Sequence, residues 1–470
     1  MFMQIKTVDL IQIRNMPVPR DGKTKLPMPD HGYSTIVRIC ATRDGVRHVG
    51  LGEIRALNSL TGETPDKAYE IAQQLGRALV GLRLEEDDNP ARATHALMDG
   101  VLRSEFGIAP ETLLPERFYP AVRLGFDAAL LDALARSRDE SVASLLGAGQ
   151  TTGPVQRNVH SRKFSKPSKI LNSMMHGDHP TGWLRGRVDR SVKKSVSVLK
   201  AIALASGGDS DILEGVCYVI NGGWTPKHVD VLTTQMSESA PLRQSSLKVL
   251  LEQPFPAYAT GWYQDLLNRI AALDDPFLGR VRVMIEDGVR TAAGIERSAA
   301  LMPHVDIKIV PQTHGSLFAI REALDRARAL GFDGRIYLGN AGMNTELNSL
   351  LLASLALTMT QPPLFSADRK SEEPRPIRQF HPQLTTDPAD RHRLFLPKGA
   401  GWGSELCRSS LEKRLRNCIR FSCNGIETKT TRLKAQLIAE AFDDSTLEIA
   451  HTREAATTDK DDNTTFTHEA

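Results

Sequence analysis

GVCYVIN, at residues 215–221, is the first of five short apolar runs that decide the fold. Most of the runs end in polar residues, and a polar segment with helical spacing separates each run from the next. The other four are LKVLLE at 247–252, VRVMIE at 281–286, VDIKIV at 305–310 and GRIYLG at 334–339. Strands that alternate with helices in this way are typical of βαβ units in a parallel sheet. The repetition predicts an α/β fold with a modified (β/α) barrel, in which the C-terminal ends of the strands carry the chemistry.

The first part of the chain has a different pattern and predicts a separate α+β unit. Polar and apolar residues alternate at 5–13 and 34–39, which predicts two antiparallel strands. The connection at 15–33 is rich in proline, glycine and charge, and its length favours a functional lid over a plain hairpin turn. A cap residue followed by proline predicts that a helix begins at Thr64. The apolar run at 121–136 predicts a largely buried helix.

Composition excludes several classes of protein. The chain has 470 residues, 41% of them hydrophobic, which is enough for a full core and more than one domain. A formal charge of +3 predicts neither a nucleic-acid partner nor a membrane-surface protein. The five cysteines form no CxxC pair, which favours reduced thiols, and no signal peptide or long apolar stretch is apparent. We therefore expect a cytoplasmic protein.

Short motifs along residues 5–410 carry a family resemblance. They are Gly52-Glu53 with LTGET at 60–64, FDAALLD at 126–132, NGGWTP at 221–226, LEQP at 251–254, MIEDG at 284–288, Ile307-Lys308, GMNTE at 342–346 and LPKGAGWG at 396–403. In this order they resemble the enolase superfamily, nearest its muconate-lactonizing, dipeptide-epimerase and methylaspartate ammonia-lyase branches. The resemblance implies that a capping domain covers a modified barrel.

The resemblance also implies a division of the chain and a reaction. Residues 1–125 would form the capping domain, 126–395 the barrel and 396–425 a segment that returns to the cap. A partly disordered extension would follow at 426–470, and leucine and isoleucine spacings within 408–445 suit surface helices. The reaction would be Mg²⁺-assisted removal of the proton α to a carboxylate, leading to elimination, cycloisomerisation or epimerisation of a small carboxylic or amino acid. This makes the chain a lyase or isomerase, and we expect a homo-oligomer.

The metal ligands that the resemblance implies are incomplete. Glu252 and Glu286 stand at the second and third ligand positions of the family, and Asp287 is the neighbour that a one-residue shift would substitute. The family's first ligand is an aspartate, but Val219 occupies that position and cannot bind a metal. Because side chains alternate along a strand, Asn221 is expected on the same face as Val219 and could offer its amide oxygen.

The proton-transfer groups also depart from the family. Where many relatives have Lys-x-Lys, this chain has Arg185 and Arg187, which suit binding a substrate carboxylate better than acting as bases. Lys308 remains as the candidate base, and a single base favours elimination or cycloisomerisation over two-base racemisation. His314 and Asp368 are further candidates for substrate contact.

Two other interpretations stay open. The chain could be a relative that binds an acidic ligand without a metal or without turning it over, which the lost aspartate favours. It could also be an interaction protein that uses its basic C-terminal segment. Glu252 and Glu286 at the strand ends could also be plain ion-pair partners that hold no metal.

Overall fold

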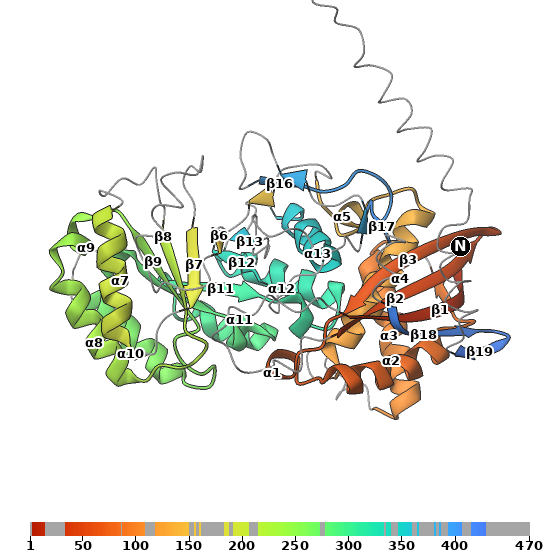
Figure 1. Ribbon diagram of the computed structural model, residues 1–470, viewed down its shortest axis with the longest axis horizontal. Helices are drawn as coiled ribbons and strands as arrows, with labels where there is room; N and C mark the ends of the chain where they lie inside the picture. The colour runs from red at the N-terminus through yellow and green to blue at the C-terminus, as the bar shows by residue number, and fades with distance from the viewer. Residues whose placement is uncertain are drawn as a thin grey trace, which may run out of the picture.

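The computed structural model describes residues 2–14, 33–85, 87–108, 118–149, 155–156, 159–160, 183–187, 191–205, 215–272, 278–332, 335–339, 346–359, 364–365, 380–381, 385–386, 393–406 and 415–428. Figure 1 shows the two parts into which these residues fold, with the N-terminal strands on the right and the parallel sheet on the left. Among the described helices, none has the length and apolar character needed to cross a membrane. The expected lid at 15–33 lies outside the described residues except for Tyr33.

The capping domain is built on a six-stranded antiparallel sheet. Its strands are β1 (Phe2–Arg14), β2 (Tyr33–Arg43), β3 (Val46–Ile54), β4 (Arg83–Glu85), β18 (Leu415–Ser422) and β19 (Gly425–Thr428). The order is β19-β18-β1-β2-β3, and β4 pairs with the first residues of β1. The expected pairing of the two N-terminal strands is confirmed, with Val8 opposite Ile39. The cap helices are α1 (Asn58–Thr61), α2 (Pro65–Leu79) and α3 (Pro90–Phe106).

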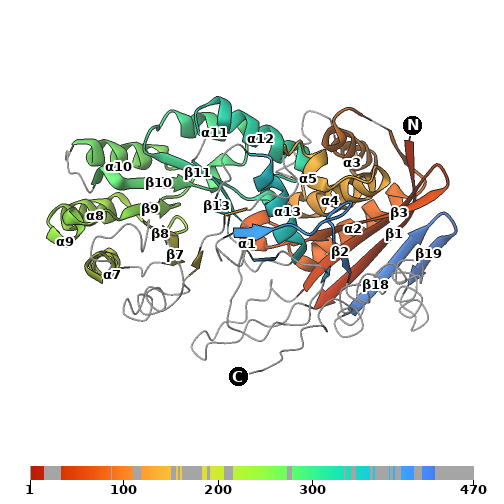
Figure 2. The same cartoon turned by 90° about the horizontal axis from the view of Figure 1, so that it is seen from above.

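Helix α4 (Pro120–Ser137) joins the cap to the barrel. Sixteen of its residues are buried, as the apolar run predicted. The helix lies along the cap strands (Figure 2), and glycines allow it to come this close. A Cβ on Gly52 would lie 1.8 Å from the carbonyl oxygen of Gly125, and a Cβ on Gly125 would lie 2.5 Å from Cγ1 of Ile54. Since real Cβ atoms do not approach other atoms so closely, both positions need glycine.

The second part is an eight-stranded parallel sheet in sequence order from β6 to β13, curled as in a (β/α) barrel. Its strands are β6 (Val159–His160), β7 (Trp183–Arg187), β8 (Gly215–Val219), β9 (Lys248–Glu252), β10 (Val281–Ile285), β11 (Val305–Ile309), β12 (Ile336–Leu338) and β13 (Leu364–Phe365). The five apolar runs of the sequence are five of these strands, and every described residue of β8 and β11 is buried. The expected fold class is therefore confirmed.

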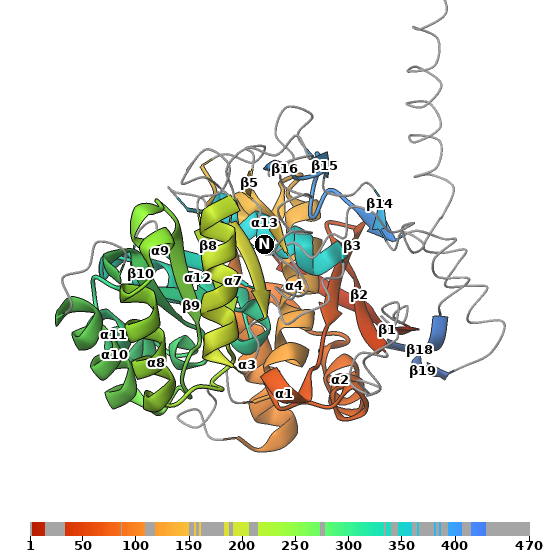
Figure 3. The same cartoon turned by 60° about the vertical axis from the view of Figure 1, so that its left-hand side comes forward.

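Helices cover the outer face of this sheet (Figure 3). The helices of this second part are α5 (Val142–Leu145), α7 (Val192–Ala205), α8 (Pro226–Ser237), α9 (Ala240–Gln244), α10 (Thr260–Ala272), α11 (Ala292–Ala299), α12 (Leu317–Ala329) and α13 (Glu346–Leu357), with short 3-10 turns at η3 (Leu278–Arg280), η4 (Asp287–Val289) and η5 (Pro311–Thr313). Their apolar sides and the strands share one large core. Shorter strands complete the fold: β5 (Val155–Gln156), β14 (Phe380–His381), β15 (Thr385–Thr386), β16 (Arg393–Phe395) and β17 (Glu405–Leu406).

The chain returns to the cap after the barrel. The Trp402 backbone N–H donates to Asp132 in α4 at 2.8 Å, and its indole N–H donates to the Leu51 carbonyl oxygen in β3 at 2.7 Å. Strand β18 then pairs antiparallel with β1, so residues 415–428 form a hairpin of the cap sheet. The expectation of surface helices is wrong for these residues, because β18 is covered on both faces and its apolar residues follow no strict alternation.

Candidate functional site

Charged side chains meet where neighbouring strands of the barrel end. Glu252 is the last residue of β9, and Glu286 directly follows β10. Lys308 lies in β11, and Arg185 lies in β7. The strands β7 to β11 are neighbours in one parallel sheet, so their C-terminal ends share one edge. Strand order thus brings together residues that are far apart in the sequence.

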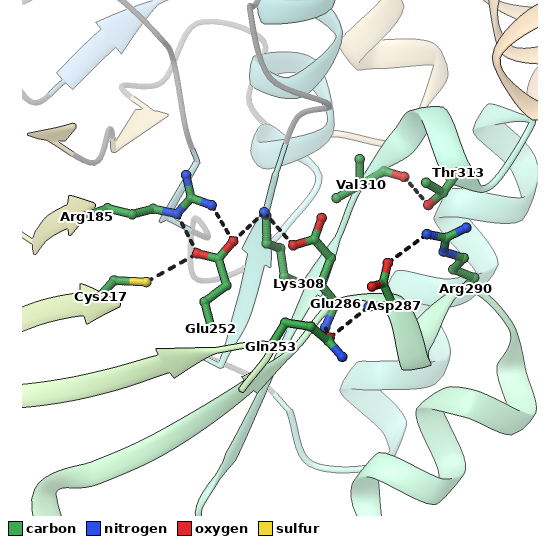
Figure 4. A network of polar contacts seen from close by, with 10 residues as sticks. All are labelled: Arg185, Cys217, Glu252, Gln253, Glu286, Asp287, Arg290, Lys308, Val310 and Thr313. Carbon is green, nitrogen blue, oxygen red and sulfur yellow. Dashed lines mark hydrogen bonds and ion pairs between the residues drawn. The ribbon is translucent and has the colours of Figure 1, made fainter. Parts of the chain in front are cut away.

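The four side chains form a continuous ion cluster, shown in Figure 4. Nζ of Lys308 lies 2.8 Å from Oε1 of Glu252 and 2.9 Å from Oε2 of Glu286. Arg185 grips Glu252 with two nitrogens: Nε donates to Oε2 at 2.5 Å, and Nη2 donates to Oε1. Such a two-point contact fixes both partners more firmly than a single hydrogen bond. Together the Arg185, Glu252, Lys308 and Glu286 side chains are called the ion cluster below.

Burial and charge act in opposite directions on these groups. Glu252 is fully buried, which alone would raise its pKa, but the charges of Arg185 and Lys308 outweigh burial and hold the pKa well below its usual range. Burial would lower the pKa of Lys308, but Glu252 and Glu286 outweigh it and raise the pKa. Burial raises the pKa of Glu286, against the opposing charge of Lys308. Lys308 therefore rests as an ammonium group, and Glu286 is the weaker of its two anionic partners.

A glycine that the sequence reading did not single out fixes the path of the lysine chain. Gly339 follows β12, beside the strand that carries Lys308. A Cβ at this position would lie 2.0 Å from Cε of Lys308 and 3.1 Å from its Cδ. The methylene chain of Lys308 thus occupies the space that any other residue would need. The sequence signal for this contact was a glycine at the end of a barrel strand, because glycine in a strand often marks a place where another group comes close to the backbone.

Gln253 is a second residue that the sequence reading missed. Its Oε1 accepts hydrogen bonds from the backbone N–H groups of Glu286 and Asp287, at 2.8 and 3.0 Å. Its Nε2 donates to the Phe255 carbonyl oxygen at 2.7 Å, and the residue has a φ of +48°. Gln253 thereby fixes the backbone that carries Glu286. The sequence signal for this role was a glutamine that directly follows Glu252, a predicted metal ligand, at the end of an apolar run.

Two predicted metal ligands do not join the ion cluster. Asp287 is exposed, and its carboxylate accepts a hydrogen bond from Arg290 at 2.7 Å. Asn221 is also exposed, with a φ of +55°, two residues beyond the end of β8. The argument that Asn221 shares a face with Val219 assumed that the strand continues. The left-handed turn breaks that alternation, so the argument fails.

The predicted substrate contacts are placed differently from one another. Arg185 belongs to the ion cluster. His314 is buried, which lowers its pKa, so the neutral ring donates from Nδ1 to the Val310 carbonyl oxygen at 3.0 Å. This contact ties His314 to the turn after β11. The side chain of Arg187, at the end of β7, and the whole of Asp368 lie outside the described residues.

The ion cluster does not fit a resident divalent cation. The described residues include no group of three or more histidine, cysteine, aspartate or glutamate side chains able to hold a metal ion. Both oxygens of Glu252 are engaged by Arg185 and Lys308, and the buried side chain of Val219 offers no donor. Mg²⁺ is usually held by one or two carboxylates, with water or substrate at its other positions. A carboxylate whose two oxygens are already paired with cationic side chains is therefore a poor ligand for it.

No family model matches the sequence, and no curated protein matches it significantly. Solved structures do match. A dipeptide epimerase from Cytophaga hutchinsonii, complexed with Mg and a D-Ala-L-Val dipeptide, has a TM-score of 0.65 at 16% identity, over 89% of this chain and 100% of its own. The L-talarate dehydratase from Polaromonas sp., complexed with Mg and L-glucarate, has a TM-score of 0.62 at 15% identity, over 89% and 99%. A variant of muconate cycloisomerase has a TM-score of 0.62 at 18% identity, over 88% and 100%.

These neighbours are enzymes of the enolase superfamily, and this chain has their fold. The resemblance seen in the sequence is therefore confirmed at the level of fold. The match extends over nearly the full length of each neighbour, so the cap and the barrel are both included.

Proposed function

We propose that this chain binds a small carboxylic or amino acid at the C-terminal ends of β7 to β11 and moves the proton on the carbon α to the carboxylate, with Lys308 as the proton-transferring group. The observation that carries the proposal is the convergence of Lys308, Glu252 and Glu286 at hydrogen-bond distance. The neighbours support the reaction class, because an epimerase, a dehydratase and a cycloisomerase share this fold. All three kinds of reaction can involve transfer of a proton to or from the carbon α to a carboxylate.

The cluster supplies what this step needs. Removing an α proton places negative charge on the substrate carboxylate, and fixed positive charges near it lower the barrier. Arg185 points its third guanidinium nitrogen, Nη1, away from Glu252, and Figure 4 draws no contact from it. With respect to the residues drawn there, that nitrogen is a donor available to the carboxylate of a substrate. Arginine is a poor base, so Arg185 would bind and Lys308 would move the proton.

Lys308 must first lose a proton, because its resting form is the ammonium. Glu286 accepts a hydrogen bond from it at 2.9 Å, and burial already raises the pKa of this carboxyl. Transfer of a proton from Nζ to Oε2 would leave a neutral amine, which can then take the α proton. One amine acting from one face favours elimination or cycloisomerisation over racemisation by two opposed bases.

Solvent exchange tests the proposal. The protein is incubated in D₂O with a panel of amino and hydroxy acids, and loss of the α-proton signal is followed by proton NMR. Lys308→Arg keeps the positive charge of the cluster but removes the base, so we expect it to abolish exchange. The matched control is Lys248→Arg, an exposed lysine at the start of β9, which should exchange like the wild type. Exchange that survives Lys308→Arg would refute the role given to Lys308.

A second candidate function is binding of an acidic ligand without turnover. Val219 and the fully paired Glu252 favour it, since they replace the family's expected metal ligands with an apolar side chain and an ion pair. In that case calorimetry would detect binding of a carboxylic acid from the panel, while the same acid would show no exchange in D₂O.

A further inference from the structure

We propose that the positive charge of this site is built into the protein: Arg185 and Lys308 take the place of a divalent cation, so the ligand is bound without a metal. The inference rests on the proposed function in one respect, since it concerns the same site and the same carboxylate ligand. It differs from the Mg²⁺ requirement that the family resemblance implied.

The first argument is that the carboxylate oxygens that could bind a metal are already paired with cationic side chains. Glu252 is the carboxylate at the centre of the ion cluster, with both oxygens engaged by Arg185 and Lys308. Oε2 of Glu286 accepts a hydrogen bond from Lys308. The remaining described neighbour on the adjacent strand is Val219, which pairs in register with Glu252 and has no polar side-chain atom. A metal would have to break several of these contacts and would gain few oxygen ligands.

The second argument is charge balance. Arg185 and Lys308 carry two positive charges, and Glu252 and Glu286 carry two negative charges when ionised. A divalent cation added to this neutral group would leave two positive charges without a counterion in a buried place. Burying unpaired charge is costly, so the added ion is disfavoured unless a lysine or arginine leaves.

The third argument is that Lys308 has little room to leave. Its side chain is 6% exposed, and its Cε fills the space beside Gly339 that a methyl group would need. Strand β11, which carries it, is buried at every residue. The lysine is thus held in the position from which it bridges the two carboxylates.

The hydrogen-bond donors of the ion cluster also indicate the class of ligand. Among the described residues, Nζ of Lys308 donates hydrogen bonds to Glu252 and Glu286, which leaves the third of its three protons for a ligand. Figure 4 draws no contact from Nη1 of Arg185 to the other residues shown. A carboxylate has two oxygens and could accept one hydrogen bond from each group. The ligand class is therefore a small acid whose carboxylate bridges Arg185 and Lys308.

Titration with Mn²⁺ tests metal independence directly. Free Mn²⁺ is followed by electron paramagnetic resonance, and we expect the wild type to leave the free signal unchanged at millimolar Mn²⁺. Lys308→Met should gain binding, because it frees Glu286 and leaves Arg185 as the one cationic partner of Glu252 among the described residues. Adding Val219→Asp should tighten that binding. The control is Arg290→Met, which frees the exposed Asp287 and should gain nothing. Binding by the wild type that Glu252→Gln weakens at least tenfold would overturn the inference.

Two further observations keep the test decisive. If Lys308→Met does not fold, as circular dichroism would show, the wild-type titration alone still decides. Exchange in D₂O is also measured with excess EDTA. Exchange that needs added Mn²⁺ would overturn this inference and leave the proposed function standing. No exchange in any condition, together with no Mn²⁺ binding, would overturn the proposed function and support metal independence.

Discussion

Glu252→Gln would remove the negative charge that holds Arg185 and Lys308 together. Glu252 is fully buried, while the side chains of Arg185 and Lys308 are 15% and 6% exposed. Water can therefore do little to replace the lost carboxylate. Removing one member of a buried ion pair typically costs about 3–5 kcal/mol, because a charge is left buried without its partner. Here Arg185 loses its bound carboxylate, while Lys308 keeps Glu286. We expect a loss of this size at neutral pH, measured by urea denaturation followed with circular dichroism.

The same variant should change the response to acid. The folded-state pKa of Glu252 lies below the ordinary value of 4.5 for a glutamate, so the folded protein binds fewer protons at this group than the unfolded chain. The stability that Glu252 contributes is therefore complete above pH 4.5 and is lost as pH falls through the folded-state pKa. In Glu252→Gln this contribution is absent at every pH. The difference in stability between wild type and variant should shrink below pH 4.5.

Glu286→Gln is the matched control for this prediction. Burial raises the pKa of Glu286, whereas the pKa of Glu252 is held below its usual range, so the fold stabilises the charged form of Glu286 less than that of Glu252. In the variant Lys308 keeps Glu252 as its anionic partner. We expect a cost of no more than about 1 kcal/mol, comparable to one ordinary hydrogen bond. The reasoning would be refuted if Glu252→Gln stayed within about 1 kcal/mol of the wild type, or if Glu286→Gln proved the more costly change.

Three other variants test the fold around the site. Gly339→Ala should displace Lys308, abolish α-proton exchange and destabilise the protein by about 1–3 kcal/mol in urea, because its Cβ would lie 2.0 Å from the lysine Cε. Glu63→Gln should flatten the stability curve between pH 4.5 and 7: burial raises the pKa of Glu63 to about 7, so wild-type stability falls as pH rises through this window. Arg420→Met should expose the C-terminal hairpin to limited proteolysis, because Arg420 pairs with the buried Asp9 at 2.7 Å.

Controls separate these effects from general damage. Gly100→Ala adds a methyl group in open space within helix α3 and should leave exchange unchanged and stability equal or higher. For Glu63, the wild type and variant should differ little below pH 4.5, where the carboxyl is protonated in both folded and unfolded chains. Proteolysis of Arg420→Met that begins in the barrel, away from β18, would contradict the role given to Asp9 and Arg420.

Much of the barrel could be predicted because its strands are buried on both faces. Such strands appear in the sequence as short apolar runs, and the run at 305–310 gave β11 at Val305–Ile309. A lysine inside such a run stands out, since burying an unpaired amine is costly. Glu252 and Glu286 could be placed at strand ends because each directly follows the apolar residues of such a run. The prediction that Glu252, Glu286 and Lys308 lie together rested on the family resemblance, and the strand order of the parallel sheet agrees with it.

Local backbone geometry could not be predicted in the same way. Alternation along a strand suggested that Asn221 and Val219 share a face, but a positive φ at Asn221 ends the pattern. The spacing of Leu415 and Ile419 suggested a helix, yet both lie in β18, which the cap sheet encloses. Strand pairing with a segment some 400 residues away leaves no periodic signal of its own. A charged residue in a buried strand, Asp9, was the one available hint of a distant partner such as Arg420.

Charge explains why the departures at 185 and 219 are consistent with each other. Three carboxylates around a divalent cation carry a net charge of −1. In the family pattern, this is the net charge beside the neighbouring lysine. Here the first carboxylate is replaced by Val219, and Arg185 stands against Glu252. Glu252 and Glu286 with Arg185 also sum to −1 when both carboxyls are ionised. Lys308 thus meets the same net charge with a guanidinium in place of the metal, and loss of the aspartate without the arginine contact would leave no such balance.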